Sequence, residues 1–451
     1  MASTAAEPDA FFEANPSADT VDAFYTNLSG VPRGKRLRRH ELAGLYRDGV
    51  ALPGSVMVVD ITGLDLADDG MVWADGDADR VARPVAGTLS RAPWLGDRAA
   101  QVMLSMRGLD GQPAALDPRV ILQRVVDRFT ADGLTPVVAC ELEFYLIDAV
   151  RAADGGIQVA PGPDGRRPRH AQVYGLDEIE ADAGFLRDLW DACAAMGVPA
   201  GAAVSEYAPG QLEVTLAHRA ALAACDDAVR FKRAAKGCAA VHGRTATFMA
   251  KPFADQPGSG LHLHVSVDDA AGRNIFADEA EDGTPALRHA IGGVCDLMAD
   301  AMLAFAPNAN SYRRFRAGGD EPARAVWGLN ARTVPVRVPP GLATTRRLEH
   351  RIAGADANPY LAAAAVLAGI HDGLRRRTDP GPAVRGTDPG TGERLPTDWS
   401  YAIERFARSA RLADYLGGAA VDAFALVKRV EQERYNSVVT ALDYDWVLRS
   451  A

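Results

Sequence analysis

Four short segments that alternate apolar and polar residues constrain the fold of this chain more than any other feature. In residues 137–148, the apolar Leu142 and Phe144 alternate with Glu141 and Glu143. Because successive side chains of a β-strand point to opposite faces, this pattern predicts a strand with one apolar face and one carboxylate-bearing face. We expect the apolar face to lie against a hydrophobic core.

The same alternation occurs in residues 211–215, 260–267 and 348–352. The polar positions of these segments, and of the turn before residue 211, are Glu206, Glu213, His262, His264, Ser266 and Glu349. The pattern of any one of these segments, taken alone, is typical of an amphipathic strand whose polar face lies in water. Solvated faces usually carry Thr, Lys and mixed charges, however, whereas these faces carry mainly Glu and His.

If the polar faces converge, their carboxylates need cations nearby, because clustered like charges are costly without compensation. Glu and His ligands without Cys suit Mg²⁺ or Mn²⁺ better than a structural zinc ion. The cysteines are widely spaced and never form a CxxC pair, so we expect reduced and mostly buried thiols. The pattern therefore predicts a divalent-metal site on one face of a sheet.

Arginines concentrate in the C-terminal half of the chain, and guanidinium groups bind phosphate or carboxylate oxygens in pairs. The candidates are Arg313, Arg314, Arg332, Arg337, Arg346, Arg347 and Arg351. Each one taken alone fits a surface arginine equally well, but the whole set beside a two-metal site favours phosphoryl transfer. A P-loop nucleotide site is excluded, because the sequence has no GxxxxGK[ST] segment.

The charge balance argues against a general nucleic-acid or anionic-membrane binder, since 49 Lys and Arg stand against 59 Asp and Glu. No stretch approaches the roughly 18 apolar residues that a membrane span requires. The N-terminus also lacks the pattern of a secretory signal. We therefore expect a soluble, cytoplasmic protein.

Three regions are expected along the chain: a polar leader at residues 1–19, a small α+β domain at 20–115 and a second domain at 116–451. Within the small domain, residues 55–60 read as a β-rich run. Apolar residues at helical spacing predict a helix over 117–133 that leads into the second domain.

Several blocks of the sequence, taken together and in order, resemble the glutamine synthetase family. These blocks are Glu141-Leu142-Glu143-Phe144, Pro209-Gly210-Gln211-Leu212-Glu213, Lys251-Pro252, Gly258-Ser259-Gly260-Leu261-His262-Leu263-His264, Asn310-Ser311-Tyr312 and Asn358-Pro359-Tyr360. The resemblance covers the chain from about residue 20 onward. Within the family, residues 30–36, 248–252 and 347–360 are most similar to the gamma-glutamylputrescine synthetase branch, whose members ligate amines other than ammonia.

The resemblance implies an α+β fold with an N-terminal β-grasp domain and a C-terminal catalytic domain in which helices surround an antiparallel sheet. It also implies a homo-oligomer, a dodecamer of two hexameric rings, with each active site between neighbouring subunits. The implied reaction joins glutamate to an amine at the expense of ATP. The glutamate side-chain carboxylate attacks the ATP γ-phosphate, and the amine then displaces phosphate from γ-glutamyl phosphate.

By matched position, the resemblance implies two divalent ions, Mg²⁺ or Mn²⁺. One would be held by Glu143, Glu206 and Glu213, and the other by Glu141, His262 and Glu349. The residues implied on the ATP side are His264, Ser266, Arg337 and Arg347. Those implied around glutamate are Gly258, Arg314, Arg332 and Arg351. A lid carboxylate, at Asp320 or Glu321 depending on the alignment, would act in catalysis with Arg332 by shielding the acyl phosphate and accepting the amine proton.

Asn27 departs from the family, because typical members have at this position an Asp that helps a neighbouring subunit to bind ammonium. An amide attracts a cation less strongly than a carboxylate and cannot take its proton. We therefore favour an organic amine, such as putrescine or another polyamine, over ammonium, with Tyr174 as a further candidate wall of the amine pocket. In the alternative hypotheses Asn27 only caps a turn and the protein is a glutamine synthetase that uses ammonium, or it is an inactive structural or regulatory member of the family.

Overall fold

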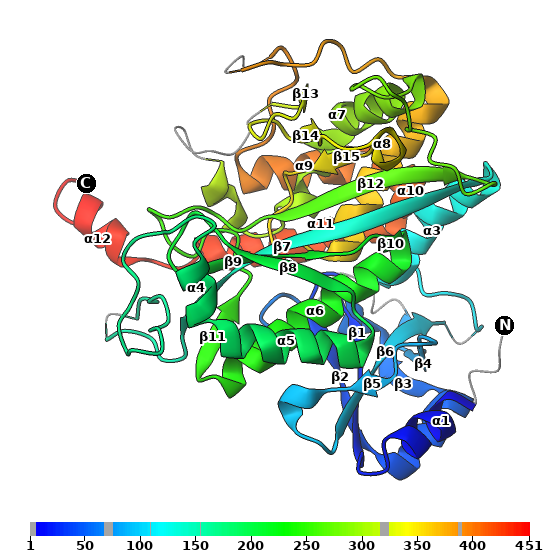
Figure 1. Ribbon diagram of the computed structural model, residues 1–451, viewed down its shortest axis with the longest axis vertical. Helices are drawn as coiled ribbons and strands as arrows, with labels where there is room; N and C mark the ends of the chain where they lie inside the picture. Colours follow the sequence, from blue (N-terminus) through cyan, green and yellow to red (C-terminus); the bar gives the residue numbers. More distant parts are fainter. Residues whose placement is uncertain (1–5, 67–74, 109, 154, 316–323, 387–389) are drawn as a thin grey trace.

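Two β-sheets organise the chain, a smaller one near the N-terminus and a larger one in the remainder (Figure 1). The computed structural model describes residues 6–66, 75–108, 110–153, 155–315, 324–386 and 390–451. The larger sheet crosses the middle of the molecule with helices around it, and the smaller sheet lies below it in Figure 1. This arrangement is the predicted α+β fold, and it fixes where the polar strand faces lie.

The N-terminal sheet has the strand order β2-β1-β6-β4-β3, with β5 paired to β6. Its strands β1 and β6 run parallel, and its other pairs are antiparallel. The strands are β1 (Thr20–Thr26), β2 (Pro32–Arg38), β3 (Val50–Pro53), β4 (Asp79–Pro84), β5 (Ser90–Arg91) and β6 (Ala99–Arg107). Helix α2 (Leu42–Asp48) lies next to β4. The segment predicted as a polar leader contains helix α1 (Glu7–Ala14), which buries Phe12 in the core of this domain.

The expectation of a β-rich run at residues 55–60 is wrong. Residues Gly54–Met57 form a short 3-10 helix instead. The carboxylate of Asp77 accepts hydrogen bonds from the backbone N–H of Ser55, at 2.7 Å, and from its hydroxyl, at 2.9 Å. These bonds hold the chain in a turn, so local tertiary contacts override the β-propensity of the valines that follow.

The larger sheet has the order β13-β14-β15-β12-β7-β9-β8, with β10 and β11 also paired to β7. It is antiparallel, as predicted, except that β13 and β14 run parallel. Its strands are β7 (Leu134–Asp148), β8 (Ala200–Ser205), β9 (Gln211–Leu216), β10 (Arg219–Ala220), β11 (Arg244–Thr247), β12 (Leu261–Asp269), β13 (Trp327–Leu329), β14 (Val336–Val338) and β15 (Leu348–His350). All four of the alternating segments read from the sequence contain one of these strands.

Helices cover the apolar side of this sheet and continue to the C-terminus. They are α3 (Pro118–Ala131), α4 (Leu176–Ala181), α5 (Ala183–Met196), α6 (Ala221–Val241), α7 (Pro285–Phe305), α8 (Pro359–Arg376), α9 (Trp399–Arg408), α10 (Ala410–Leu416), α11 (Gly418–Asn436) and α12 (Ala441–Val447). None of the helices in the described part of the chain combines the length and the apolar character that a membrane span requires.

Helix α3 shows why a helix begins where the sequence predicted one. The carboxylate of Asp117 accepts a hydrogen bond from the backbone N–H of Arg119 at 2.8 Å, and Pro118 occupies the first helical position. Such a cap satisfies a backbone donor that the helix cannot, and Pro costs nothing there. The predicted domain boundary at residue 115 falls in the connection between β6 and this helix.

Helices α7 and α8 pack closely, with glycines at their contact. A Cβ atom at Gly293 would lie 2.1 Å from the carbonyl oxygen of Gly369 and 2.5 Å from the Cα of Gly373. Any larger side chain there would push the helices apart. The expected thiols are also found: four cysteines are buried, Cys295 is partly buried, and all five are free.

Candidate active site

The polar residues of the central strands form a row across one face of the sheet, which steps by two residues from one strand pair to the next. Strand register pairs Arg337 with Glu349, Glu349 with His264, His262 with Glu141, and Glu143 with Glu213. Residues far apart in the sequence thus become neighbours because their strands are neighbours. The convergence that the sequence left open is therefore present.

Strand β7 shows how the sequence produces this row. Its residues alternate between buried and partly exposed along most of its length. On the apolar side, the ring of Phe144 packs against Phe185 of α5 and Phe231 of α6, with both centroid distances at 6.2 Å. The opposite face carries Glu141 and Glu143, whose side chains are 17% and 14% exposed. A dry core on one side and a carboxylate face on the other are what the alternation predicted.

The carboxylates and imidazoles of the row are in direct contact. His262 Nδ1 lies 2.6 Å from Glu141 Oε1, and His264 Nε2 lies 3.4 Å from Glu141 Oε2. The Nε2 atom of His262 is 3.8 Å from Glu143 Oε1. Glu143 Oε2 also accepts a hydrogen bond from the backbone N–H of Gly260 at 2.7 Å. These contacts fix the orientation of both carboxylates.

The electrostatics of the cluster show an excess of negative charge. Burial, together with the charge of Glu143, raises the pKa of Glu206 to about 7. Burial and the charges of Glu141 and Glu143 likewise raise the pKa of Glu213. Glu141 behaves in the opposite way: burial alone would raise its pKa, but His262 and His264 outweigh burial and lower it. The histidines therefore compensate Glu141 well and leave Glu206 and Glu213 short of cations.

The chemistry of these side chains and their excess of negative charge both fit the binding of divalent cations. Ligand atoms of Glu141, Glu213 and His262 all lie within 4.8 Å of one another, and so do those of Glu141, His264 and Glu349. Carboxylate and imidazole donors without Cys are the ligands expected for Mg²⁺ or Mn²⁺. The grouping differs from the one implied by resemblance, since His264, predicted on the ATP side, stands among the possible ligands.

Two arginines hold Glu349, which is 1% exposed. Arg337 Nη1 donates to Glu349 Oε2 at 2.8 Å, and Arg351 forms an ion pair with Oε1. The Nη2 of Arg337 donates to Asn330 Oδ1 at 2.8 Å, while its buried Nε has no hydrogen-bond partner among the described residues. An unpaired buried donor on a cation suits an incoming anion such as a phosphate.

Arg347 and Ser266 extend the row on the side of His264. Arg347 Nε donates to His264 Nδ1 at 3.3 Å. Because a guanidinium can only donate, Nδ1 is the acceptor in this contact and Nε2 carries the proton that faces Glu141. Ser266 lies two residues further along β12, is partly exposed, and shares the face of His264. The predicted ATP residues thus gather at one end of the row.

The residues predicted around glutamate divide into two groups. Gly258 and Arg314 are adjacent, since a Cβ atom at Gly258 would lie 2.8 Å from Cγ of Arg314. Arg314 is 4% exposed and donates to the carbonyl of Ile352 at 2.9 Å, and Arg351 joins the row through Glu349. Arg332, in contrast, is exposed and lies in a turn. Asp320 and Glu321 lie outside the described residues.

Gln211 was not singled out as a site residue from the sequence, although it lies between Gly210 and Leu212 in one of the family blocks. Its side chain is 2% exposed, and Nε2 donates to the carbonyl of Gly258 at 2.9 Å. Gln211 thereby ties β9, which carries Glu213, to the Gly258 loop. Alternation would have placed Gln211 and Glu213 on the same face, which was the available signal.

The two residues predicted for the amine pocket have different surroundings. The Asn27 side chain is 0% exposed, with Oδ1 accepting from Val31 N at 3.0 Å and Nδ2 donating to Val59 O at 3.3 Å. It holds a turn of its own domain, as one of the alternative interpretations stated. Tyr174 is 57% exposed with a positive φ of 58°, and its backbone N–H donates to Ser205 at 3.0 Å, next to Glu206.

A cavity of about 1600 Å³ lies away from this row, between the N-terminal sheet and the larger domain. Residues from both domains line it, among them Ser29, Val31, Lys232, Phe248, Asn308 and Asp356. No carboxylate or imidazole of the row is among its lining residues. We therefore assign the chemistry to the row and not to this cavity.

Comparisons with known proteins identify the family. Residues 115–447 match the glutamine synthetase catalytic domain. The chain is 38% identical over 445 residues to gamma-glutamylputrescine synthetase PuuA of Escherichia coli (strain K12), covering 98% of this chain and 94% of that protein. It is 30% identical over 437 residues to the glutamate–isopropylamine ligase of Pseudomonas sp, covering 93% of each. The solved GmaS/ADP complex matches with a TM-score of 0.85 at 28% identity, over 99% of this chain and 100% of that one. The chain therefore belongs to the glutamine synthetase family.

Proposed function

We propose that this protein is an ATP-dependent ligase that joins the γ-carboxylate of glutamate to an organic amine. The observation that carries the proposal is the row of Glu141, Glu143, Glu213, His262 and Glu349 across the four adjacent strands β15, β12, β7 and β9, flanked by buried arginines. The relatives described above support it, because two of them are named as ligases or synthetases that act on putrescine and isopropylamine.

The metal ligands of the proposed enzyme are Glu141, Glu143, Glu206, Glu213, His262 and Glu349, with His264 available to the second group. When bound there, Mg²⁺ or Mn²⁺ supplies positive charge that polarises phosphoryl oxygens. The raised pKa of Glu206, caused by burial and by Glu143, supports this assignment, since the carboxylates lack a compensating charge.

The arginines would bind and orient the anionic substrates. Arg337 and Arg347 would contact the ATP phosphates, and Arg314 and Arg351 would hold the carboxylates of glutamate. Attack of the glutamate γ-carboxylate on the ATP γ-phosphate forms γ-glutamyl phosphate and ADP. Because charge develops on the transferred phosphoryl group, fixed guanidinium groups stabilise it without reorganising. Arg332 would complete the clamp on the exposed side.

In the second step the amine nitrogen attacks the acyl carbon, the bond to the phosphoryl oxygen breaks, and phosphate leaves. The amine must lose a proton as the new bond forms, and we assign that proton to the lid carboxylate, Asp320 or Glu321. The same group would shield the acyl phosphate from water. The products are a γ-glutamylamide, ADP and phosphate.

An organic acceptor is supported by the relatives rather than by Asn27. The Asn27 side chain is committed to Val31 and Val59 of its own turn, so the missing Asp does not by itself select the amine. Putrescine is the first candidate, because the relative with 38% identity is named for it. Ammonium, the substrate of a glutamine synthetase, is the competing acceptor.

The first experiment is phosphate release with ATP, glutamate and Mg²⁺ across ammonium, putrescine, spermidine, isopropylamine, ethanolamine and an aromatic amine. The products are identified by mass, and Glu143→Ala in the same oligomeric state is the inactive control. A preference for one organic amine supports the ligase assignment and names its substrate. A preference for ammonium makes the protein a glutamine synthetase, and no turnover with any amine makes it an inactive member of the family.

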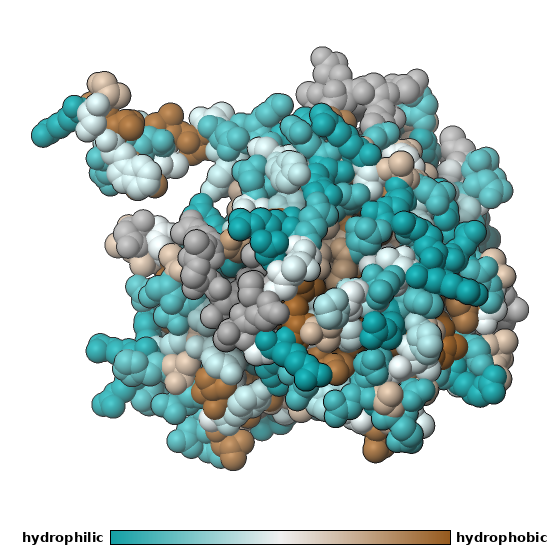
Figure 2. Space-filling view, turned by 90° about the horizontal axis from the view of Figure 1, so that it is seen from above, coloured by the Kyte–Doolittle hydropathy of each residue, from teal (hydrophilic) through white to brown (hydrophobic). Residues whose placement is uncertain are grey.

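We also propose that the protein is a homo-oligomer, a dodecamer with active sites between subunits, in the cytoplasm. Helix α12 and the residues beside it support association, because they stand away from the body of the molecule (Figures 1 and 2). They expose the apolar side chains of Val438, Val439, Leu442, Tyr444, Trp446, Val447 and Leu448. Apolar surface in a projecting segment is typical of a subunit interface. Removal of residues 441–451 should lower the mass that light scattering measures for the intact assembly.

A further inference from the structure

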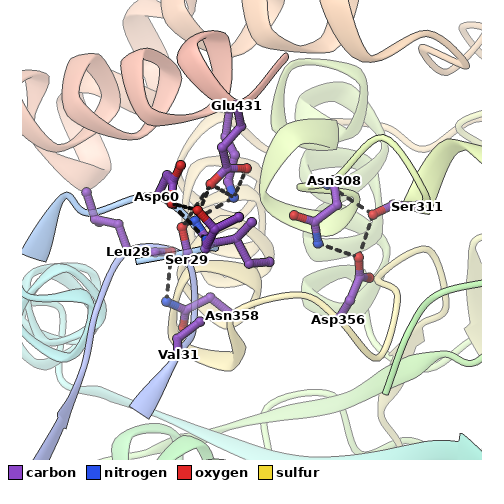
Figure 3. Close-up of polar contacts among 12 residues, drawn as sticks. Leu28, Ser29, Val31, Asp60, Asn308, Ser311, Asp356, Asn358 and Glu431 are labelled. Atoms are coloured by element: carbon purple, nitrogen blue, oxygen red, sulfur yellow. Dashed lines mark hydrogen bonds and ion pairs between the residues drawn. The ribbon is translucent and has the colours of Figure 1, made fainter. Parts of the chain in front are cut away.

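Two of the sequence blocks that carry the family resemblance, and a segment that precedes a third, have no role in the row, yet the structure brings them together. They are Lys251-Pro252, Asn310-Ser311-Tyr312 and the segment that precedes Asn358-Pro359-Tyr360. The side-chain amide of Asn310 makes two hydrogen bonds with the backbone of Lys251, both at 2.9 Å. Figure 3 shows Asp356 directed at Asn308 and Ser311. Asp356 therefore joins its own segment to the one that contains Ser311.

The carboxylate of Asp356 fixes the start of the short helix that carries Arg314. Asp356 Oδ2 accepts from the Ser311 hydroxyl at 2.6 Å and from Asn308 Nδ2 at 2.7 Å. The Ser311 hydroxyl also accepts from the backbone N–H of Asn308 at 3.0 Å. Ser311 is 0% exposed and begins the 3-10 helix Ser311–Arg314. Hydrogen bonds to a carboxylate are about twice as strong as neutral ones, so this contact anchors that helix firmly.

The chain segment that carries Asp356 also holds the Gly258–Gly260 loop, part of the glutamate site of the proposed function. The backbone N–H of Leu261 donates to Ala353 O at 2.8 Å, and that of Ala355 donates to Ser259 O at 2.9 Å. A Cβ atom at Gly354 would lie 2.4 Å from Asp356 Oδ1 and 3.3 Å from Arg314 Nη1. There is therefore no room for a side chain at Gly354, between the Asp356 carboxylate and the Arg314 guanidinium.

A lysine on α6 supports the same segment. Lys232, on α6, reaches the carbonyl oxygens of Ala355 at 2.7 Å and Ala357 at 3.5 Å. The next residue, Asn358, donates to the carbonyls of Asn27 and Leu28 in the N-terminal domain at 3.1 and 3.2 Å, and Figure 3 shows Asn358 below Leu28. Residues 353–358 are thus fixed from three directions: by α6, by the N-terminal turn and by the Asn308–Ser311 turn.

We infer that Asp356 is a positioning residue for glutamate, which sets the relative placement of Arg314 and the Gly258–Gly260 loop. This inference rests on the proposed function, in which Arg314 and Gly258 bind glutamate. Asp356 would act through these groups and not by touching the substrate. Because a clamp must hold its ligand to within a fraction of an ångström, loosening the anchor should weaken glutamate binding selectively.

The test compares Asp356→Ala, Asp356→Asn and Asp300→Ala in the full-length protein. Asp300 is a matched control, since it accepts from the Ser409 hydroxyl at 2.9 Å and from Arg405 Nη2 at 2.6 Å, joining α7 to the start of α10. We expect the glutamate KM of Asp356→Ala to rise by at least about tenfold. The KM values for ATP and the amine should change by less than about twofold, and Asp356→Asn should recover part of the loss because it keeps one acceptor oxygen.

Lys232→Met provides a second perturbation, which loosens residues 353–357 and removes a nearby cation, but leaves the hydrogen bonds of Asp356 to Asn308 and Ser311 in place. It should raise the glutamate KM in the same selective way. If Asp356→Ala does not fold, Asp356→Asn and Lys232→Met decide the question. The inference is overturned if the variants leave the glutamate KM within twofold of Asp300→Ala, or if they raise the ATP and glutamate KM values equally.

Calorimetric titration of glutamate in the presence of ADP and Mg²⁺ separates this inference from the proposed function. Lack of turnover by the wild-type protein with every amine would contradict the proposed function. If wild-type protein then still binds glutamate and Asp356→Ala binds it at least about tenfold more weakly, the positioning role stands. Equal glutamate affinity in the wild type, Asp356→Ala and Asp300→Ala would remove the positioning role whatever the amine.

Discussion

Glu141 and His262 occupy directly paired positions on β7 and β12, and His262 Nδ1 lies 2.6 Å from Glu141 Oε1. The pairing is a consequence of strand register, because it joins residues that are 121 positions apart in the sequence. Glu141 also belongs to both groups of possible metal ligands. It is therefore the residue on which the two halves of the proposed metal site depend.

Glu141→Gln should weaken metal binding more than any other single conservative change in the row. The substitution keeps the size of the side chain but removes the charge shared by both groups. Loss of a residue that hydrogen-bonds to a metal ligand typically lowers metal affinity by about 10- to 100-fold. Loss of a ligand that is common to two metal groups should therefore lower the affinity by about 100-fold or more. Titration calorimetry with Mn²⁺ measures the effect.

The control for this experiment is Glu404→Gln, at an exposed position of α9. This variant also removes one negative charge from the protein, but at a position that is not part of the row. Mn²⁺ affinity that is equal in Glu141→Gln and Glu404→Gln would show that the row does not hold the metal.

The raised pKa of Glu206 predicts how the stability of the metal-free protein depends on pH. Burial and Glu143 raise this pKa from 4.5 to about 7. The folded protein therefore binds more protons than the unfolded chain between these values, and stability is lost as the pH rises through them. The loss is on the order of 1–3 kcal/mol by linkage. Thermal unfolding in EDTA should show a falling midpoint between pH 5 and 8.

Glu206→Gln should flatten this dependence, because a neutral amide cannot titrate. Adding Mg²⁺ to the wild-type protein should raise the unfolding midpoint more at pH 8 than at pH 5, since metal ligands must lose their protons. A midpoint that rises with pH in EDTA, or a Mg²⁺ effect that does not depend on pH, would contradict the assignment of Glu206 to the site.

The sequence was sufficient to locate the strands of the site but not to order them. Alternation identified β7, β9, β12 and β15 and the faces on which their charged residues lie, because that information is local. Which strand lies beside which is set by long-range pairing, so the contact of His264 with Glu141 was not predicted and His264 was placed with ATP only. Asp356 shows the same limit, since its partners Asn308 and Ser311 lie more than forty residues away.

Where local pattern and tertiary contact compete, the structure follows the contact. Residues 55–60 have the composition of a strand, yet Asp77 holds Ser55 in a 3-10 turn. Asn27 is the opposite case, because its preference for turns is a local property and the structure uses it in a turn. Its meaning for amine choice depended on a neighbouring subunit, which no local pattern describes.

Asn27→Asp should destabilise the protein without converting it to an ammonium-using enzyme. Asn27 accepts from the N–H of Val31 and donates to the carbonyl of Val59. An Asp side chain can make only the first of these bonds, and it would direct a buried carboxylate oxygen at the Val59 carbonyl. The expected cost is about 1–3 kcal/mol. Thermal unfolding and initial rates with ammonium and putrescine measure the two effects.

Asn27→Ser is the matched comparison, because it removes the amide without adding charge. It should be less destabilising than Asn27→Asp at neutral pH. A gain of ammonium turnover in Asn27→Asp, at unchanged stability, would instead support a direct role for this position in the amine site.

The ion pair between Lys428 and Glu431, both on α11, should be the most costly polar contact to break where this helix meets the N-terminal domain. Lys428 is 0% exposed, and its Nζ lies 2.9 Å from Glu431 Oε2. Glu431 Oε1 accepts from the backbone N–H of Ile61 at 2.8 Å, so the pair links α11 to the N-terminal domain. Figure 3 shows Glu431 close to Ser29 and Asp60 of that domain. Lys428→Met would leave Glu431 buried without a cation, which typically costs about 3–5 kcal/mol.

The double variant Lys428→Met/Glu431→Gln separates the charge from the packing. A Gln side chain can still accept from Ile61, and it carries no charge that needs compensation, so most of the lost stability should return. Lys35→Met, at an exposed position of β2, controls for the loss of one positive charge and should change the unfolding midpoint little. If the single and double variants are equally unstable, Lys428 contributes through its packed hydrocarbon chain and not through the ion pair.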